Sequence, residues 1–305
     1  MDRFQQMSVF VAVAETQSFA AAARRLRMSA PAVTRAVSAL EAQLGVQLLT
    51  RTTRVVRVTD IGERYLADAR RILNDLEEAE AAAAGINATP RGQLSITAPV
   101  LFGKLYVMPI LAEYQTTYPQ TEVHALFVDR VVNLVDEGMD VGIRIGELPD
   151  STVRAIGVGR VRRIVVAAPA YLEQHGVPAT PEDLPAHRLV VPGGIWSTSE
   201  WTFEPNGQRQ TVRVRPGIIT NTNDGALEAA RLGYGMTRLL SYQVAPQLAT
   251  GELVRVLADF EGPDLPVHVI HREGRHGSAK VRSFVDMAIE RLRGAEALGW
   301  GAAGR

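Results

Sequence analysis

The stretch SFAAAARRLRMSAPAVTRAVSALEAQLG, residues 18–45, predicts two helices separated by a tight turn. Ser18 is a favourable N-cap for a first helix through Leu26, because its side-chain oxygen can accept a hydrogen bond from an otherwise unpaired backbone N–H. Ser29 can cap a second helix in the same way, with a proline in the first turn, where the missing N–H costs nothing. Gly45 is suited to end that helix.

The second helix has two distinct faces. One face is apolar and recurs at positions i, i+4, i+7 and i+11, which places it against a core; its residues are Val33, Val37, Leu40 and Leu44. The other face is small or polar, and a helix of this width fits the major groove of DNA. The pattern predicts a DNA-binding helix-turn-helix, with an ordinary helical hairpin of an all-α domain as the alternative.

Side chains on the second face are suited to reading DNA bases. Arg35 can bind guanine through two hydrogen bonds, and Ala30 can contact the methyl group of thymine. Hydroxyl groups on the same face can bond to bases or phosphates. We expect the DNA contacts of this helix to come from Ser29, Ala30, Pro31, Thr34, Arg35 and Ser38.

The segment LLTRTTRVVRVT, residues 48–59, is rich in β-branched residues and predicts a short hairpin, the wing of a winged helix. Its arginines and threonines suit phosphate oxygens, which position a protein on DNA without specifying sequence. We therefore add Arg51, Thr52, Thr53 and Arg54 to the expected DNA contacts. An edge hairpin that uses arginine to prevent aggregation is the alternative.

The charge distribution also favours a DNA-binding head. The 305 residues have a net charge of zero, but residues 1–59 hold eight arginines and three acids, and residues 60–90 hold seven acids and three arginines. The local field, more than the total charge, attracts DNA. A basic head followed by an acidic helix is typical of a small DNA-binding domain on a stalk.

Composition excludes several other classes of protein. The chain has no cysteine, which excludes a disulfide scaffold, thiolate metal sites and cysteine catalysis. Its N-terminus lacks a signal-peptide pattern, and no apolar run approaches membrane-spanning length. With 46% hydrophobic residues it can form two or three domains. We expect a soluble, cytoplasmic protein with no membrane partner.

Two further helices flank the helix-turn-helix. Residues 3–15 predict a helix with an apolar stripe that can pack on the helix-turn-helix. Residues 60–86 predict a long helix whose apolar positions keep the three-four spacing over nearly four heptads, which favours a dimeric coiled coil. Packing of this helix against its own domain is the alternative. The segment NATPRG, residues 87–92, predicts a linker.

This order of elements resembles the LysR-type transcriptional regulators over the N-terminal 90 residues. The wing and the segment EGMDVGIRIGELPD, residues 137–150, look most like the CrgA-like subgroup. Ala30 departs from the family, which often carries a polar base-contacting residue there. The resemblance is carried by PAVTR at 31–35, Leu40-Glu41, Leu44-Gly45, RTTR at 51–54, Thr59 and Gly62.

From Gly92 onward strands and helices alternate, which predicts a parallel sheet covered by helices. The expected first series is strand 94–98, helix 104–118, strand 122–128, helix 131–137 and strand 141–145. The expected second series has strands 163–168, 189–191, 211–214, 218–220 and 235–239, with a helix at 225–232. The chain then returns through an expected strand at 267–271 and a long helix at 278–293.

The resemblance implies a periplasmic-binding-protein-like effector domain of two α/β lobes with a small molecule in the cleft between them. The expected fold class is thus α + α/β, with a winged helix-turn-helix, a long linker helix and this two-lobed domain. The expected boundaries are 1–59 for the DNA-binding domain, 60–90 for the dimerisation helix and hinge, and 91–305 for the effector domain. Its lobe I spans about 91–162 and 266–295, and lobe II about 163–265.

Ligand sites of α/β folds form at the carboxyl ends of strands, where helix N-termini point N–H groups at anionic oxygens. The strand-to-helix turns at 97–103 and 220–225 should therefore face each other, and apolar residues on the first turn indicate an amphipathic ligand. The expected effector-binding residues are Thr97, Pro99, Val100, Leu101, Phe102, Asp129, Arg144, Trp196, Asn223 and Asp224.

Several of these residues have structural alternatives. Asn223 and Asp224 can simply cap the following helix, Arg144 can pair with a structural acid, and Trp196 can serve packing. The sequence contains no motif for a catalytic serine, a phosphate-binding loop or a zinc protease. His268 and His271 fall on opposite faces of a strand, which is not a metal site. We expect no catalytic residue, metal or cofactor.

The leading hypothesis is a transcriptional regulator that binds double-stranded operator DNA as a dimer and responds to a small-molecule effector. The dimer forms through the linker helix, and tetramers or larger homo-oligomers are expected from the resemblance. RNA polymerase is a further partner that we consider. The alternatives are a non-specific architectural DNA-binding protein and a solute-binding or enzymatic α/β domain with a helical appendage.

Overall fold

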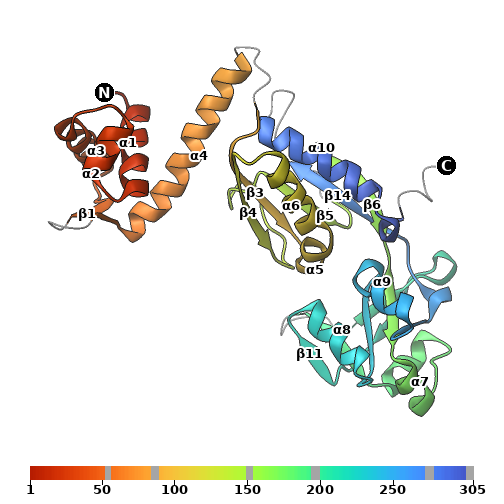
Figure 1. The fold of residues 1–305 in the computed structure, drawn as a ribbon. Coiled ribbons are helices and arrows are strands. Elements are labelled where there is room, and N and C mark those ends of the chain that lie inside the picture. The colour runs from red at the N-terminus through yellow and green to blue at the C-terminus, as the bar shows by residue number, and fades with distance from the viewer. Residues whose placement is uncertain (52–55, 84–88, 149–153, 194–199, 272–277, 300–305) are drawn as a thin grey trace. The chain divides into compact units, whose positions relative to one another are not determined.

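The computed structural model describes residues 1–51, 56–83, 89–148, 154–193, 200–271 and 278–299. The chain forms two compact units, Met1–Gln93 and Leu94–Arg305 (Figure 1). The first unit contains α1 (Arg3–Thr16), α2 (Phe19–Arg25), α3 (Ala30–Leu44), β1 (Leu49–Arg51), β2 (Val56–Val58) and α4 (Asp60–Ala83).

The helix-turn-helix forms as its capping residues predict. Ser18 accepts a hydrogen bond from the backbone N–H of Ala21, and Ser29 accepts one from that of Ala32. Gly45 ends α3 with a φ of 71°, a left-handed conformation that glycine adopts without strain. β1 and β2 pair antiparallel, so the predicted hairpin is confirmed.

The core of the first unit lies between α1, α3 and the start of α4. Val33, Val37 and Leu40 of α3 are fully buried, as the apolar repeat predicts, and pack with Phe10 and Val13 of α1. Burying each such side chain contributes about 1.5–3 kcal/mol. This packing fixes which face of α3 points outward.

Helix α4 uses part of its apolar stripe inside its own unit. Leu66 and Ala69 are buried in the core, and Tyr65 and Leu73 pack against it. Ile72 keeps 37% of its surface exposed. The alternative of packing against its own domain therefore holds for the helix up to Leu73, and Ile72 lies on the exposed side of the same segment.

The second unit is built on two five-stranded sheets. The first has the order β4-β3-β5-β14-β6 and the second the order β11-β8-β12-β7-β13. In the first, β3 (Gly92–Ala98) and β5 (Val141–Ile145) are parallel, and β14 (Leu265–His271) runs antiparallel between β5 and β6 (Arg154–Val161). The predicted parallel pairing is confirmed for β3 and β5, and the expected return of the C-terminal segment to this lobe inserts β14 as an antiparallel strand.

The remaining strands are short or lie at sheet edges. They are β4 (Thr121–Phe127), β7 (Arg163–Ala167), β8 (Leu189–Pro192), β11 (Ile218–Thr220), β12 (Met236–Leu240) and β13 (Val254–Val256). β9 (Glu200–Phe203) and β10 (Gln210–Arg213) form a separate hairpin.

Helices cover both sheets. On the first, α5 (Val100–Phe102), a π-helical turn (Gly103–Val107) and α6 (Met108–Thr117) follow one another directly, and α10 (Ala279–Arg293) packs against α6 (Figure 1). On the second lie α7 (Pro169–His175), α8 (Asn223–Arg231) and α9 (Ser241–Thr250). Short 3₁₀ turns occur at Pro181–Ala186, Pro205–Gly207, Ala258–Phe260 and Glu296–Leu298.

The chain crosses between the two sheets at two adjacent points. One crossing follows β6 at Arg162, and the other precedes β14 at Asp264. The Arg162 Nε atom donates to the Asp264 carboxylate over 2.7 Å, so the two crossings are tied together.

The predicted helix over 131–137 does not form. Residues 134–138 make a turn, in which the Asn133 side chain accepts from the backbone N–H of Val135 and donates to Asp136. Asn and Asp side chains compete with helical hydrogen bonds in this way, so the apolar spacing alone was misleading.

Candidate nucleic-acid interface and ligand pocket

The outward face of α3 carries the predicted DNA contacts. Ala30, Pro31, Arg35 and Ser38 are exposed, as is the capping residue Ser29. Thr34 is half-buried, and its hydroxyl donates to the carbonyl of Ala30 over 3.0 Å. Among the described residues no acidic side chain pairs with Arg35, so its guanidinium group is available to a ligand.

The wing is only partly described. Arg51 ends β1 opposite Val56, whereas Thr52, Thr53 and Arg54 lie outside the described residues. Arg57 in β2 is exposed. This strand therefore offers a further cation on the wing.

Glu41 connects α3 to the wing, a role that the sequence reasoning missed. One carboxylate oxygen accepts hydrogen bonds from the backbone N–H groups of Leu48 and Leu49, over 2.9 and 3.1 Å. Bonds to an ionised acceptor are stronger than neutral ones. The wing is thus held in a fixed register with the recognition helix. The sequence did contain an indication of this role, because Glu41 is an acidic residue on the side of α3 that faces the core.

The start of α4 is fitted to the same segment. Thr59 accepts a hydrogen bond from the N–H of Gly62 over 2.9 Å, and its own N–H donates to the carbonyl of Leu48. Gly62 lies so close to that carbonyl that a side chain cannot be accommodated. These contacts give a physical reason for the presence of Thr59 and Gly62, two of the residues that carry the family resemblance.

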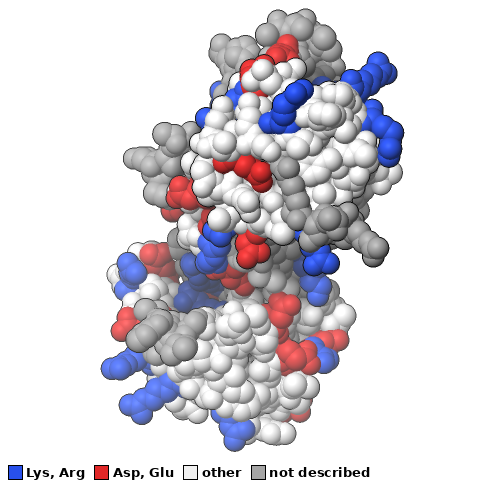
Figure 2. Space-filling view, turned by 90° about the vertical axis from the view of Figure 1, so that its left-hand side faces the viewer, with Lys and Arg blue, Asp and Glu red and all other residues white. Residues whose placement is uncertain are grey.

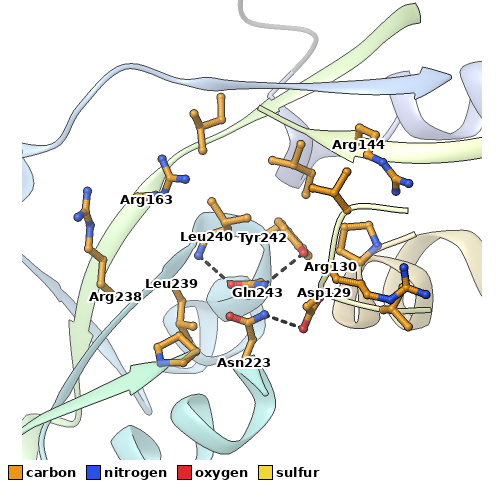
Figure 3. Close-up of a pocket in the computed structure, with 16 residues that line it drawn as sticks. Asp129, Arg130, Arg144, Arg163, Asn223, Arg238, Leu239, Leu240, Tyr242 and Gln243 are labelled. Atoms are coloured by element: carbon orange, nitrogen blue, oxygen red, sulfur yellow. Dashed lines mark hydrogen bonds between the residues drawn. The ribbon is translucent and has the colours of Figure 1, made fainter. Parts of the chain in front are cut away.

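A pocket of about 390 Å³ opens in the second unit, between the carboxyl end of the first sheet and the second sheet (Figure 3). Of the predicted effector-binding residues, Pro99, Asp129, Arg144 and Asn223 line it. The other lining residues are Val128, Arg130, Val131, Ile145, Arg163, Pro192, Arg238, Leu239, Leu240, Tyr242, Gln243 and Leu265.

The other predicted wall residues need correction. Leu101 and Phe102 do not line the pocket, because the helical turn after β3 points both side chains into the core. Thr97 lies within β3 itself and is fully buried, so it does not line the pocket either. Phe102 packs instead on the rings of Tyr106 and Tyr242. Val100 and Asp224 lie at the ends of their helices without lining the pocket, and Trp196 lies outside the described residues.

Asp129 joins the two predicted turns. One of its carboxylate oxygens accepts from the backbone N–H of Val100 over 3.0 Å, at the start of α5. The other accepts from the Asn223 side chain over 3.1 Å, at the start of α8 (Figure 3). The turns therefore face each other as predicted, and a single carboxylate bridges them.

The capping alternative for Asn223 is wrong. Thr222 is the N-cap of α8 and accepts the hydrogen bond from Gly225, so Asn223 is already the first helical residue. Its side chain is left free to reach Asp129 across the pocket.

Two of the pocket arginines are satisfied within the protein. Arg130 makes two hydrogen bonds to Glu137, over 2.6 and 2.5 Å, which raises the pKa of the guanidinium and lowers that of the carboxyl. Arg144 donates to the carbonyls of Ile143 and Val132, and burial lowers its pKa. Arg144 thus bonds to two backbone carbonyls, and not to a structural acid as the alternative interpretation expected.

The sequence reasoning missed the opposite wall, formed by β7, β12 and the start of α9. Arg238 donates to the carbonyl of Thr202 and stacks over the ring of Phe203, 4.9 Å from its centre. Burial, followed by the nearby charge of Arg163, lowers the pKa of Arg238 to about 10. An arginine inside the otherwise apolar strand MTRLL was the signal that could have found this wall.

Tyr242 and Gln243 complete that wall. Gln243 accepts from the N–H of Leu240 over 2.8 Å and donates to the Tyr242 hydroxyl over 3.3 Å (Figure 3). Burial raises the pKa of Tyr242, so the hydroxyl stays protonated. The pocket thus combines polar groups with an apolar lining.

The face of the molecule shown in Figure 2 is mixed in charge. On this face, basic and acidic side chains are interspersed among wide uncharged areas (Figure 2). Every helix in the described part of the chain is too short or too polar to cross a membrane. No three His, Asp or Glu side chains gather as metal ligands within those same residues.

Comparison with known proteins gives consistent matches along the chain. Residues 4–63 match the family "Bacterial regulatory helix-turn-helix protein, lysR family", and residues 87–293 match "LysR substrate binding domain". The regulator PtxR of Pseudomonas aeruginosa is 34% identical, covering 93% of this chain and 91% of its own. An uncharacterised HTH-type regulator of Haemophilus influenzae is 31% identical, covering 92% and 98%.

Solved structures match over the whole chain as well. CrgA, a LysR-type regulator from Neisseria meningitidis, is 29% identical with a TM-score of 0.61, covering 94% of this chain and 98% of its own. The Vibrio cholerae virulence activator AphB is 26% identical with a TM-score of 0.59, covering 95% and 99%.

Proposed function

The chain belongs to the LysR family of DNA-binding transcriptional regulators, and from this premise we propose how its parts divide the work. The exposed face of α3 reads operator bases in the major groove, and the wing contacts phosphates. The pocket of the second unit binds a small-molecule effector that modulates DNA binding or transcription. The observation that carries the DNA-binding proposal is Arg35, which is exposed and has no ion pair among the described residues, on a helix whose opposite face is buried in the core.

The DNA-binding proposal is tested by fluorescence-anisotropy titration of the full chain. The protein is titrated against the DNA upstream of its own gene and against scrambled DNA of the same length, at several salt concentrations. We expect at least about a thousandfold preference for the upstream DNA at physiological salt. Equal binding to both DNAs with a steep salt dependence would instead favour a non-specific architectural protein.

We also propose that α4 forms the dimer contact and that residues 60–90 act as the linker between domains 1–59 and 91–305. Ile72 supports this proposal, because it is an apolar residue of α4 that stays exposed while its neighbours Ala69 and Leu73 pack on the helix-turn-helix. We further propose that the dimers assemble into tetramers or larger homo-oligomers and that the regulator contacts RNA polymerase. So does the absence of an enzymatic role, which the regulatory relatives favour.

An effector acts by binding one arrangement of the lobes better than another, and its effect is limited by that difference in affinity. The proposed lobe I comprises about 91–162 and 266–295, and the proposed lobe II about 163–265. The Asp129–Asn223 hydrogen bond links these two lobes directly. We propose that it favours the closed arrangement.

Asn223→Ala is expected to shift the lobes toward a more open arrangement by about threefold to tenfold, because one hydrogen bond is worth about 0.5–1.5 kcal/mol. The chain has no cysteine, so dyes on Gln120→Cys and Gln208→Cys report the distance by energy transfer. Asn221→Ala, at an exposed position two residues before Asn223, is the control. If Asn223→Ala left the distribution of energy-transfer efficiency between the two dyes unchanged, the proposed link would be contradicted.

A further inference from the structure

Two pocket arginines lie next to each other without an acidic partner. Arg163 of β7 lies opposite Leu240 in the antiparallel register, and Arg238 of β12 lies opposite Val165. Positions two residues apart on a strand share a face, so the two arginines are diagonal neighbours on one face of the sheet. Figure 3 shows both guanidinium groups on the same wall of the pocket.

The surroundings do not neutralise this pair. Within the described residues Arg163 has no hydrogen bond or ion pair, and Arg238 is held only by the Thr202 carbonyl and the Phe203 ring. The nearby acid Glu261 has both carboxylate oxygens bonded to Arg255, each over 2.5 Å. Glu261 offsets part of the charge of Arg238 but is shared with Arg255, so the pair keeps an excess of positive charge at the edge of a partly buried pocket.

The remaining polar groups of the pocket are already occupied. Arg130 is paired with Glu137, Arg144 is bonded to two carbonyls, and Asp129 bridges Val100 and Asn223. An anion entering the pocket thus meets its strongest free donors at Arg163 and Arg238. The predicted anion site at the start of α5 is filled by the Asp129 carboxylate.

Resting on the proposed function, we propose that the effector is a small organic acid whose carboxylate is bound by Arg163 and Arg238. Guanidinium groups bind carboxylates through two parallel hydrogen bonds, and the anion relieves the repulsion between the two cations. The apolar part of the acid packs on the lining, which includes Leu239, Leu240 and Leu265. A volume of about 390 Å³ is at the small end of ligand pockets and suits a compact acid.

The lining distinguishes an organic acid from an inorganic anion. Phosphate would satisfy the two arginines equally well, but it would leave the apolar residues of the pocket without contact. An organic acid uses both parts of the pocket. The matching neutral amide would lose the charge-assisted hydrogen bonds and should not bind.

The test measures binding to the full chain without DNA, by calorimetric titration and thermal unfolding. The probes are benzoate and adipate as an aromatic and an aliphatic acid, benzamide as the neutral analogue of benzoate, and inorganic phosphate. At least one acid should bind and raise the Tm with concentration, and benzamide should not. Binding of neither acid, or equal binding of phosphate and acids, would overturn the proposal.

Variants locate the site. Arg163→Gln and Arg238→Gln should each weaken binding of the acid by about tenfold to a hundredfold, as expected for a lost charge-assisted bond. Arg213→Gln, an exposed arginine on β10, is the matched control and should leave the affinity unchanged. Arg163 is itself exposed, so its variant folds even where Arg238→Gln perturbs the sheet. Unchanged affinity in Arg163→Gln would overturn the assignment.

The same variants separate this inference from the proposed function. Without any acid present, the control Arg213→Gln should keep the preference for upstream over scrambled DNA. Failure of the acids to bind while that preference persists removes the organic-acid assignment alone. Loss of the preference in the unmodified protein removes the proposed function, whatever the pocket binds.

Discussion

Gly62→Val is expected to abolish DNA binding, because another backbone segment lies where the new side chain must go. A Cβ atom at position 62 would lie 2.1 Å from the carbonyl oxygen of Leu48 and 2.7 Å from Val58 Cγ1. That carbonyl is fixed by the hydrogen bond from the N–H of Thr59, over 2.9 Å. Overpacking costs about 1–3 kcal/mol against adaptable side chains. Against backbone we expect about 3 kcal/mol for Gly62→Ala and more for valine.

The measurement combines thermal unfolding with anisotropy on the upstream DNA. The control is Gly294→Ala at the end of α10, where a Cβ atom would meet Glu290 and Arg291 only at ordinary contact distances of 3.5 and 3.6 Å. It should change neither the Tm nor DNA affinity appreciably. If Gly62→Ala behaved like this control, the close packing of α4 on the segment before the wing would be wrong.

Local features of the sequence predicted the first unit well. The caps at Ser18 and Ser29 and the stop at Gly45 depend on hydrogen bonds within three or four residues. The buried stripe of α3 depends only on helical periodicity. These local predictions are correct because the packing of the core favours the same helix ends and the same buried face. The close approach at Gly62 could not be derived from the sequence, since its partner Leu48 lies in the segment before β1, outside the local pattern of α4.

The ligand pocket depended on contacts that no short pattern contains. Asp129 and Asn223 are 94 residues apart, and Arg163 meets Arg238 only through the register of two strands. Strand-end reasoning located Asp129 and Asn223, because those positions follow from the α/β alternation. It also placed Leu101 and Phe102 in the wall, although the helical turn directs both into the core. Side-chain direction within a turn requires the backbone geometry itself.

Arg35→Ala is expected to reduce the preference for upstream over scrambled DNA by about tenfold to a hundredfold, with little change in binding to scrambled DNA. The side chain is exposed on α3, and a bidentate contact to guanine is worth about 1–3 kcal/mol of discrimination. Anisotropy titrations on both DNAs give the ratio directly. Arg35→Lys keeps the charge but loses the planar fork, so it should lose most of the same preference.

Arg57→Ala is the matched control, because this arginine is exposed on the wing strand β2 and has the same charge. A phosphate contact there should weaken binding to both DNAs alike and lower the salt slope by about 1. The two variants thus differ in which DNA is affected, and not merely in total affinity. If Arg35→Ala weakened binding to upstream and scrambled DNA equally, Arg35 would be a phosphate contact, and base recognition would have to come from other residues of the α3 face.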